Sequence, residues 1–344
     1  MQYWTKDEQG QTLYRYSLCN RNGMKARFCN LGASLLELHV PNTQQHLIPC
    51  VLGYKDPNQF IQDQHFLGVT VGRYCNRIDD ARFSLNGQTF QLTPNEGSNQ
   101  LHGGAGFAKR LWTCLKHTDT QVRFGFHSPD GDQGFPGNLT VEALYELTED
   151  NTLVFTWTAQ SDADTVASLT NHAYFNLGST QDVLSHTLQL PLSHYTPIDD
   201  QGIPTGAIAP VHDTVFDFTH TRKLQEHLTP LDDALSTTKG FDHNWCQAPN
   251  TWDTSCKTVA RLTNPAKVLS LQVQSTLPGL QVYTGNHLAE TGVFGTHEGI
   301  CLETQFFPNS PNEPLFPSAL LRAGERMTHQ TRFQFGSDQI DTAK

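Results

Sequence analysis

Alternation of apolar and polar residues with a period of two is the feature that most constrains the fold of this chain. Leu139–Leu147 alternates in this way, and the pattern resumes over Leu153–Ala159 after the turn residues Glu149-Asp150-Asn151. Successive side chains of a strand point to opposite faces, so the pattern predicts a hairpin of two strands. A second hairpin is predicted around Asn86-Gly87, because that dipeptide tolerates the positive φ that tight hairpin turns require.

Other stretches extend this strand pattern, and helical signals are few. Further strands are expected at Val268–Thr276, Leu280–Thr284 and Arg332–Phe335. Asp56-Pro57 predicts a short helix that ends near Gln64. Leucines recur at helical spacing over residues 224–235, although Pro230 interrupts them. No linker or fixed-period repeat divides the chain, so we expect an all-β fold: one large antiparallel β-sandwich domain over residues 1–344, with few short helices.

The balance of charge narrows the range of partners. The 344 residues include 34 acidic and 23 basic side chains, for a net charge of -11. An acidic surface repels phosphate backbones, so we expect no nucleic-acid partner. No apolar run approaches the roughly 18 residues that span a bilayer, and residues 1–8 lack the apolar core of a secretory signal. We expect a cytoplasmic protein with no membrane contact, as a monomer or a homodimer, whose eight cysteines are reduced.

One predicted strand carries a row of polar groups. If Thr170–Leu177 is a strand, alternation places Thr170, His172, Tyr174 and Asn176 on one face. An ordinary solvent-facing side of an antiparallel strand explains this row equally well.

Two further strands favour a binding site. Glu303 and Gln305 share a face of the apolar run Cys301–Phe307, and Gln281 and Tyr283 share a face of Leu280–Tyr283. A carboxylate in such an apolar run is either a rim residue or a buried group held for function. Polar planar groups beside aromatic rings are typical of carbohydrate sites, since sugars present both hydroxyls and flat C–H faces.

Three loop segments add candidates, and each has a plainer explanation. His102 stands before the pair Gly103-Gly104, which allows backbone to approach a ligand, but loop histidines are common. Arg73 and Arg77 flank the amide of Asn76, and such arginines often form structural ion pairs. Asp242 follows Gly240-Phe241 and resembles a turn residue.

The familiar motifs for other chemistries are missing from the sequence. There is no H-E-x-x-H or C-x-x-C metal motif, no phosphate-binding G-x-x-x-x-G-K-[ST] or G-x-G-x-x-G, and no G-x-S-x-G elbow. We therefore expect no metal ion and no cofactor. The remaining set, one carboxylate with one or two histidines, suits proton transfer.

Taken together, the segments resemble one family, the aldose 1-epimerases or galactose mutarotases. The matching segments, which occur in family order, are Gly72–Ile78, Asn99–Gly104, Thr170–Leu177, Gly240–His243, Gln281–Asn286 and Leu302–Gln305 with Pro308 and Asn312. The resemblance implies a galactose-mutarotase-like supersandwich with a shallow sugar pocket and no cofactor. It further implies that the substrate is a small-molecule aldose.

The resemblance also assigns roles to individual residues. His172 is similar to the general acid of the family and Glu303 to its general base. The residues at positions that contact the sugar or line its pocket are Asn76, Arg77, His102, Tyr174, Asp242 and Gln281. The chain departs from the family pattern at Cys75, Ala173, Phe241 and Asn309, which puts fine specificity in doubt but removes no proton-transfer group.

The implied reaction is mutarotation, the interconversion of α and β anomers of free aldohexoses such as galactose and glucose. A base removes the proton of the C1 hydroxyl while an acid protonates the ring oxygen, the ring opens, and it closes from the other face. At ordinary pKa values a glutamate is ionised at neutral pH and a histidine can supply the proton. Two alternatives stay open: a non-catalytic sugar-binding module, and an epimerase of hexose 6-phosphates, which needs an anion pocket.

Overall fold

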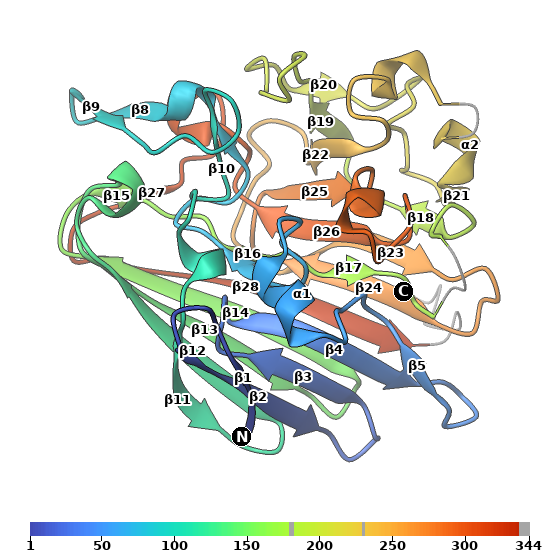
Figure 1. Ribbon diagram of the computed structural model, residues 1–344. Coiled ribbons are helices and arrows are strands. Elements are labelled where there is room, and N and C mark those ends of the chain that lie inside the picture. The colour runs from blue at the N-terminus through green and yellow to red at the C-terminus, as the bar shows by residue number, and fades with distance from the viewer. Residues whose placement is uncertain (179–181, 229–230, 337–344) are drawn as a thin grey trace.

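Antiparallel strands make up most of the computed structural model, which describes residues 1–178, 182–228 and 231–336 (Figure 1). The largest sheet has nine strands in the order β11 (Thr113–His117), β12 (Gln121–Ser128), β13 (Leu139–Leu147), β14 (Thr152–Ser161), β28 (Arg326–Gly336), β24 (Ser270–Ser275), β23 (Lys257–Thr263), β18 (Thr187–Gln189) and β21 (Arg222–Lys223). The all-β prediction is confirmed.

Two further sheets complete the layers. The six-stranded sheet has the order β17 (Tyr174–Phe175), β26 (Ile300–Gln305), β25 (Gly279–Tyr283), β22 (Asp242–Cys246), β19 (His194–Thr196) and β20 (Ala209–Pro210). The five-stranded sheet comprises β1 (Gln2–Lys6), β2 (Thr12–Cys19), β3 (Lys25–Cys29), β4 (Ser34–Pro41) and β5 (Leu47–Pro49). In Figure 1 strands β22, β25 and β26 lie above the large sheet. The blue strands β1–β5 lie in the lower part of the view, near β12 and β13.

Short elements connect these sheets. Four two-stranded pairs are β6 (Thr70–Val71) with β16 (Thr170–Asn171), β7 (Arg77–Ile78) with β10 (Gln100–Leu101), β8 (Arg82–Leu85) with β9 (Gln88–Gln91), and β15 (Thr165–Val166) with β27 (Leu320–Leu321). The α-helices within the described ranges are α1 (Pro57–Gln62) and α2 (Gln225–Leu228). Neither is long and apolar enough to cross a bilayer, and no other helix in those ranges is.

Aromatic residues fill the space between the layers. The Phe28 ring of the five-stranded sheet lies 4.6 Å from that of Tyr145 in the large sheet. On the other side Phe175 lies 5.2 Å from Phe333, which joins the six-stranded and nine-stranded sheets. These residues belong to one buried apolar cluster that all three sheets share. The single domain over residues 1–344 stays a prediction.

Most of the predicted elements are present. Leu139 pairs with Ser161 and Leu147 with Leu153, so the β13–β14 hairpin has the predicted turn, and β8–β9 pair around Asn86-Gly87. The predicted strands at Val268–Thr276 and Leu280–Thr284 form β24 and β25, which lie in different sheets. All eight cysteines are free.

The two helix predictions have different outcomes. Asp56 caps α1 as predicted, since its side chain accepts a hydrogen bond from the amide of Asn58. The leucine run over residues 224–235 forms only the single turn of α2 and a short 3₁₀ turn at Asp233–Leu235. Pro230 lies outside the described residues.

The prediction of one strand over Thr170–Leu177 is wrong. Thr170–Asn171 pairs with β6, whereas Tyr174–Phe175 pairs with β26 of the six-stranded sheet. The chain changes partner at His172-Ala173, so alternation does not hold across the whole segment. The side chains of His172 and Tyr174 share a cleft, but Thr170 instead bonds the Tyr145 hydroxyl.

Candidate active site

A cleft of about 350 Å³ opens beside the six-stranded sheet. Its floor comes from β22, β25, β26 and the residues around β17, and its walls come from loops at residues 64–66, 96–102, 200–202, 237–238 and 287–290. Seven of the residues predicted for the site line it: Asn76, Arg77, His102, His172, Tyr174, Asp242 and Glu303.

Glu303 and His172 face each other at the base of the cleft. Glu303 stands on β26 directly opposite Gln281 of β25, and His172 lies at the break between β16 and β17. Their side chains are 3% and 5% exposed, and His172 Nε2 is 3.7 Å from Glu303 Oε1. Oε2 of Glu303 is buried and has no hydrogen-bond partner among the described residues. This carboxylate oxygen therefore has unused hydrogen-bonding capacity beside the cleft that Glu303 lines.

Burial shifts the protonation of this pair. Desolvation raises the pKa of Glu303 well above its usual range, the charge of Asp242 raises it further, and Arg77 opposes the rise. Desolvation also lowers the pKa of His172 to about 4. Burial thus favours the uncharged form of each group, the protonated acid of Glu303 and the neutral imidazole of His172. This differs from the ionised Glu303 that ordinary pKa values predict.

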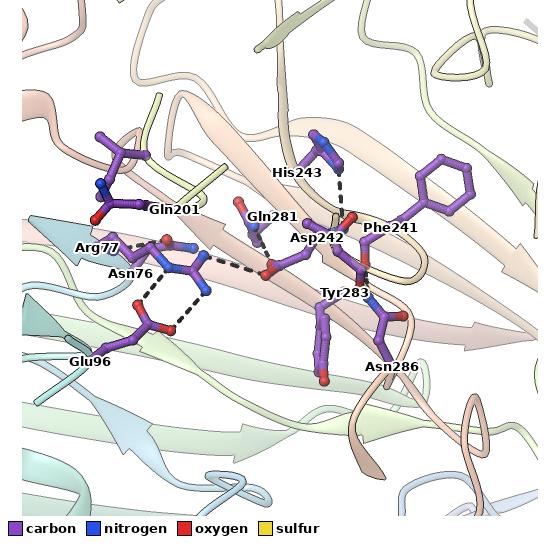
Figure 2. Close-up of polar contacts among 12 residues, drawn as sticks. Asn76, Arg77, Glu96, Gln201, Phe241, Asp242, His243, Gln281, Tyr283 and Asn286 are labelled. Carbon is purple, nitrogen blue, oxygen red and sulfur yellow. Dashed lines mark hydrogen bonds and ion pairs between the residues drawn. The ribbon is translucent and has the colours of Figure 1, made fainter. Parts of the chain in front are cut away.

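Arg77 lies between two carboxylates at one side of the cleft (Figure 2). Its Nε and Nη2 donate to the two oxygens of Glu96 at 2.7 and 3.0 Å, a bidentate contact that fixes the plane of the guanidinium. Its Nη1 is 3.4 Å from Asp242 Oδ2. Burial alone would lower the pKa of Arg77, but its two acidic partners outweigh burial and raise the pKa, so Arg77 stays charged.

Gln281 lies behind Asp242 rather than on the cleft surface. Its Nε2 donates to Asp242 Oδ1 at 2.7 Å, and its Oε1 accepts from Gln305 at 3.3 Å. Only 2% of Gln281 is exposed. The predicted contact between Gln281 and the sugar stays a prediction, and the hydrogen bond that the structure shows is the one to Asp242 (Figure 2).

His102 is held in one orientation by the loop that carries Asn76. The Asn76 amide donates to His102 Nδ1 at 3.1 Å, and the His102 amide donates to the Asn76 carbonyl at 3.1 Å. Nδ1 is an acceptor, so the ring proton is assigned to Nε2. Burial lowers the pKa of His102 well below its usual value, with His172 and Arg77 adding to the effect. His102 therefore presents a neutral N–H donor.

The hydrogen bond from the Asn76 amide to His102 Nδ1 also affects whether the site can bind a metal ion. Ligand atoms of His102, His172 and Glu303 lie within 4.8 Å of one another, a set of residue types that zinc uses. Coordination through Nε2 of His102 requires its proton to move to Nδ1, where it would face the N–H of Asn76. This backbone donor disfavours the metal-binding tautomer.

Tyr174 packs against His172. Its ring lies 5.0 Å from that of His172, and its hydroxyl donates to the carbonyl of His65 at 2.8 Å. Burial raises the pKa of Tyr174 well above its usual value, so it remains a neutral donor.

Several cleft residues are missed by the sequence patterns. They are His65, Phe66, Glu96, Asp200, Gln201, Gly202, Thr237, Thr238, His287 and Glu290. All lie in loops except Glu290, which lies in a short 3₁₀ helix, and no periodicity marks any of them. Glu96 is six residues before His102, and that proximity is the one signal in the sequence that points to it.

Arg73 and the positions that depart from the family pattern lie away from the cleft surface. Arg73 donates to backbone carbonyls, among them those of Pro136 and Gly137, which is a structural role but not the ion pair considered above. Cys75, Ala173, Phe241 and Asn309 are buried and do not line the cleft. None of the four departures therefore adds a side chain to the cleft lining.

The cleft joins a buried carboxylate and histidine to neutral and charged hydrogen-bonding groups on a β-sandwich, an arrangement that suits proton transfer on a ligand rich in hydroxyls. The family model for aldose 1-epimerase matches residues 14–334, and the chain belongs to this family. An aldose 1-epimerase of Haemophilus influenzae is 40% identical over 93% of this chain and 94% of its own. A galactose mutarotase of Mus musculus is 38% identical, with 95% of each chain covered.

Solved structures agree with this assignment. The galactose 1-epimerase of Lactobacillus acidophilus superposes with a TM-score of 0.85 and 28% identity, with 97% of each chain covered. The supersandwich prediction is therefore confirmed.

Proposed function

We propose that this chain interconverts the α and β anomers of free aldohexoses, galactose and glucose among them. The observation that carries the proposal is the buried pair of His172 and Glu303, with one carboxylate oxygen unpartnered at the base of a polar cleft. Family membership supports the reaction class, and the cleft offers candidates for the groups that perform it.

Mutarotation moves one proton in each direction. Glu303 as general base accepts the proton of the C1 hydroxyl, and His172 as general acid gives a proton to the ring oxygen. The C1–O5 bond breaks, C1 becomes an aldehyde, rotation about C1–C2 exposes its other face, and closure returns both protons. The pair ends each cycle with the single proton that it began with.

Sugar binding prepares the pair for this step. In the free cleft burial favours the proton on Glu303. A C1 hydroxyl that donates to the unpartnered Oε2 stabilises the carboxylate, and the proton then resides on His172. His172 Nε2 and Glu303 Oε1 are 3.7 Å apart, which is close enough for the two groups to act on the adjacent C1 hydroxyl and ring oxygen.

The other polar groups hold the remaining hydroxyls. We assign Asp242 as an acceptor and Arg77, His102 and Asn76 as donors. Glu96 and Gln281 fix the orientation of Arg77 and Asp242. This preorganisation keeps C1 and O5 against the pair.

The cleft argues against hexose 6-phosphates. Arg77 is the sole arginine or lysine among the described residues that line it, and two carboxylates already neutralise its charge. Acidic side chains in the lining also include Asp200 and Glu290. A dianionic phosphate in this surrounding is repelled. Retention of both proton-transfer groups argues against a binding module.

Polarimetry with fresh α-D-galactose, α-D-glucose and glucose 6-phosphate tests the proposal. We expect faster decay of optical rotation for the two free sugars and little change for the phosphate. Decay at the buffer rate with folded protein present would overturn it. Activity without added metal or cofactor, a cytoplasmic location and a monomeric or homodimeric state remain predictions.

A further inference from the structure

The segment between α1 and β6 brings one aromatic ring into the cleft, that of Phe66. The ring centroid lies 4.7 Å from that of His102 and 5.9 Å from that of His172. The residue lines the cleft and also packs against the buried cluster that contains Phe60 and Val69. Phe66 thus lies between a hydrophobic cluster and the two histidines.

The backbone of Phe66 has an unusual conformation. Its φ is 60°, in the left-handed region that a bulky side chain rarely adopts. Such conformations persist where the surrounding structure imposes them, and they cluster at ligand sites.

Asp63 is the main support of this conformation. It is buried, and its Oδ1 accepts hydrogen bonds from the Tyr54 hydroxyl at 2.7 Å and the His65 amide at 3.1 Å. Its Oδ2 accepts from the Leu67 amide at 2.9 Å. One carboxylate therefore fixes the residue on each side of Phe66.

Two further contacts connect the segment to the reaction centre. The His65 carbonyl accepts from Tyr174, and the Gly68 amide donates to the carbonyl of His172 at 3.0 Å. The position of the Phe66 ring is thus fixed relative to His172.

We propose that Phe66 is a sugar-contacting and shielding residue of this site. Its ring meets the apolar C–H face of the bound aldose and keeps water away from the His172–Glu303 pair. The inference rests on the function proposed above and goes beyond it, because it assigns the recognition of the apolar side of the sugar. Aromatic faces suit such C–H surfaces, and a dry surrounding strengthens each polar contact in the cleft.

A pH effect of Phe66 must be separated from those of other groups around His172. The titratable groups that face or influence it are Glu303 and Cys301 on β26, His102 on its loop, Tyr174 on β17, Asp242 on β22, and Asp63 and His65 on the segment of Phe66. Replacement of Phe66 by leucine changes none of them. A shift in the His172 pKa of this variant therefore reports that water has reached the His172–Glu303 pair.

The test compares Phe66→Leu, which removes the ring, with Phe66→Tyr, which keeps it. For Phe66→Leu we expect the KM for galactose to rise roughly three- to tenfold. We also expect the acid limb of kcat/KM, and the His172 pKa measured by NMR of the ring protons, to move up by about one pH unit. Phe66→Tyr should keep wild-type values in all three measurements.

Controls address folding and backbone strain. Phe66→Gly adopts a positive φ without strain and should show the same losses as Phe66→Leu, so it serves if the leucine variant unfolds. Gln45→Gly changes another residue with φ near 63° on an exposed turn and should alter neither KM nor the pKa.

The outcomes separate this inference from the proposed function. Wild-type protein that turns over galactose, with Phe66→Leu within twofold in KM and unchanged in His172 pKa, would overturn the role of Phe66. Wild-type protein with no turnover and no galactose binding would overturn the sugar contact together with the function. The NMR titration would still decide whether Phe66 shields the pair.

Discussion

Two regions of this molecule follow opposite rules. Between β12 and the five-stranded sheet, Phe124 packs edge-on against Tyr16 with 5.3 Å between ring centroids, and alternation matches burial along the strands. In the cleft, a carboxylic acid and a histidine are buried side by side, and Phe66 and His102 adopt positive φ. Along β12 the local preference agrees with the global fold, whereas at Phe66 and His102 the two conflict. Such conflicts are expected where a protein acts on a ligand.

The largest expected effect comes from the cleft. Glu303→Gln keeps the shape but removes the base, so kcat should fall by roughly 10²–10⁴-fold. The folded-state pKa of Glu303 is raised, so burial costs stability as pH rises above the usual range of a glutamate. The variant should therefore unfold at no lower urea concentration than wild type at pH 7. Polarimetry at saturating galactose and urea denaturation measure both; near-wild-type turnover would remove Glu303 from the base role.

The partner residue gives a matched test of the pair. His172→Asn should also slow turnover strongly, and the double variant should lose little more than either single one, because both groups serve one proton exchange. Galactose binding by calorimetry should weaken far less than turnover in each variant. Losses that multiply in the double variant would contradict the shared exchange.

The interior should respond in the opposite sense. Phe124→Ala removes a fully buried ring and should destabilise the fold by about 3–5 kcal/mol through lost burial and a cavity. Because the residue lies outside the cleft, kcat and KM per folded molecule should stay unchanged. Denaturant unfolding combined with the polarimetric assay checks this. A fall in kcat of the folded fraction would show that the two regions are coupled.

Arg73 and Arg77 allow the interior and the cleft to be compared with the same type of residue. The buried Arg73 side chain donates to carbonyls of residues 128, 129, 136 and 137, so Arg73→Met should cost about 3–5 kcal/mol and leave KM unchanged. Arg77→Met leaves Glu96 able to hydrate, since its side chain is 37% exposed. That variant should raise KM about tenfold with a smaller loss of stability. The reverse pattern would exchange their roles.

His329 and His172 are both buried and both have a lowered pKa, so variants of His329 can distinguish an effect of pH on stability from an effect on activity. Burial lowers the pKa of His329, beside Trp157 in the large sheet, to about 4, as it does for His172. The unfolded chain binds more protons than the folded chain between about pH 6.5 and 4, so stability falls as pH falls through that window. His329→Gln should remove up to about 3 kcal/mol of this loss.

The activity profile should not follow His329. The acid limb of kcat/KM reports the second protonation of the His172–Glu303 pair and should stay near pH 4 in His329→Gln. Unfolding curves and rates collected from pH 4 to 7 distinguish the two histidines. A limb that moves with His329 would tie the activity loss to unfolding rather than to the pair.

The contrast also explains what sequence alone can predict. Alternation finds β13 and β14 because one buried face fixes their register. It fails at His172, where the chain passes from one sheet to another within four residues, since periodicity carries no information about which strand is the partner. Sequence patterns also fail to identify Phe66 and Glu96, because their predicted roles depend on contacts with His102 and Arg77, which come from other segments of the chain.

The smallest expected effect is that of removing metal ions, which should leave the mutarotation rate unchanged. The His102, His172 and Glu303 cluster resembles a zinc site by residue type, so chelation discriminates between proton transfer and metal catalysis. The Asn76 amide holds His102 as an Nε2–H donor, which binds a sugar hydroxyl well and a cation poorly. EDTA treatment followed by polarimetry should therefore leave the mutarotation rate of galactose within error of the untreated protein. Loss of activity that a divalent ion restores would show that the backbone contact at Nδ1 gives way, and would move the site from the proton-transfer class to the metal class.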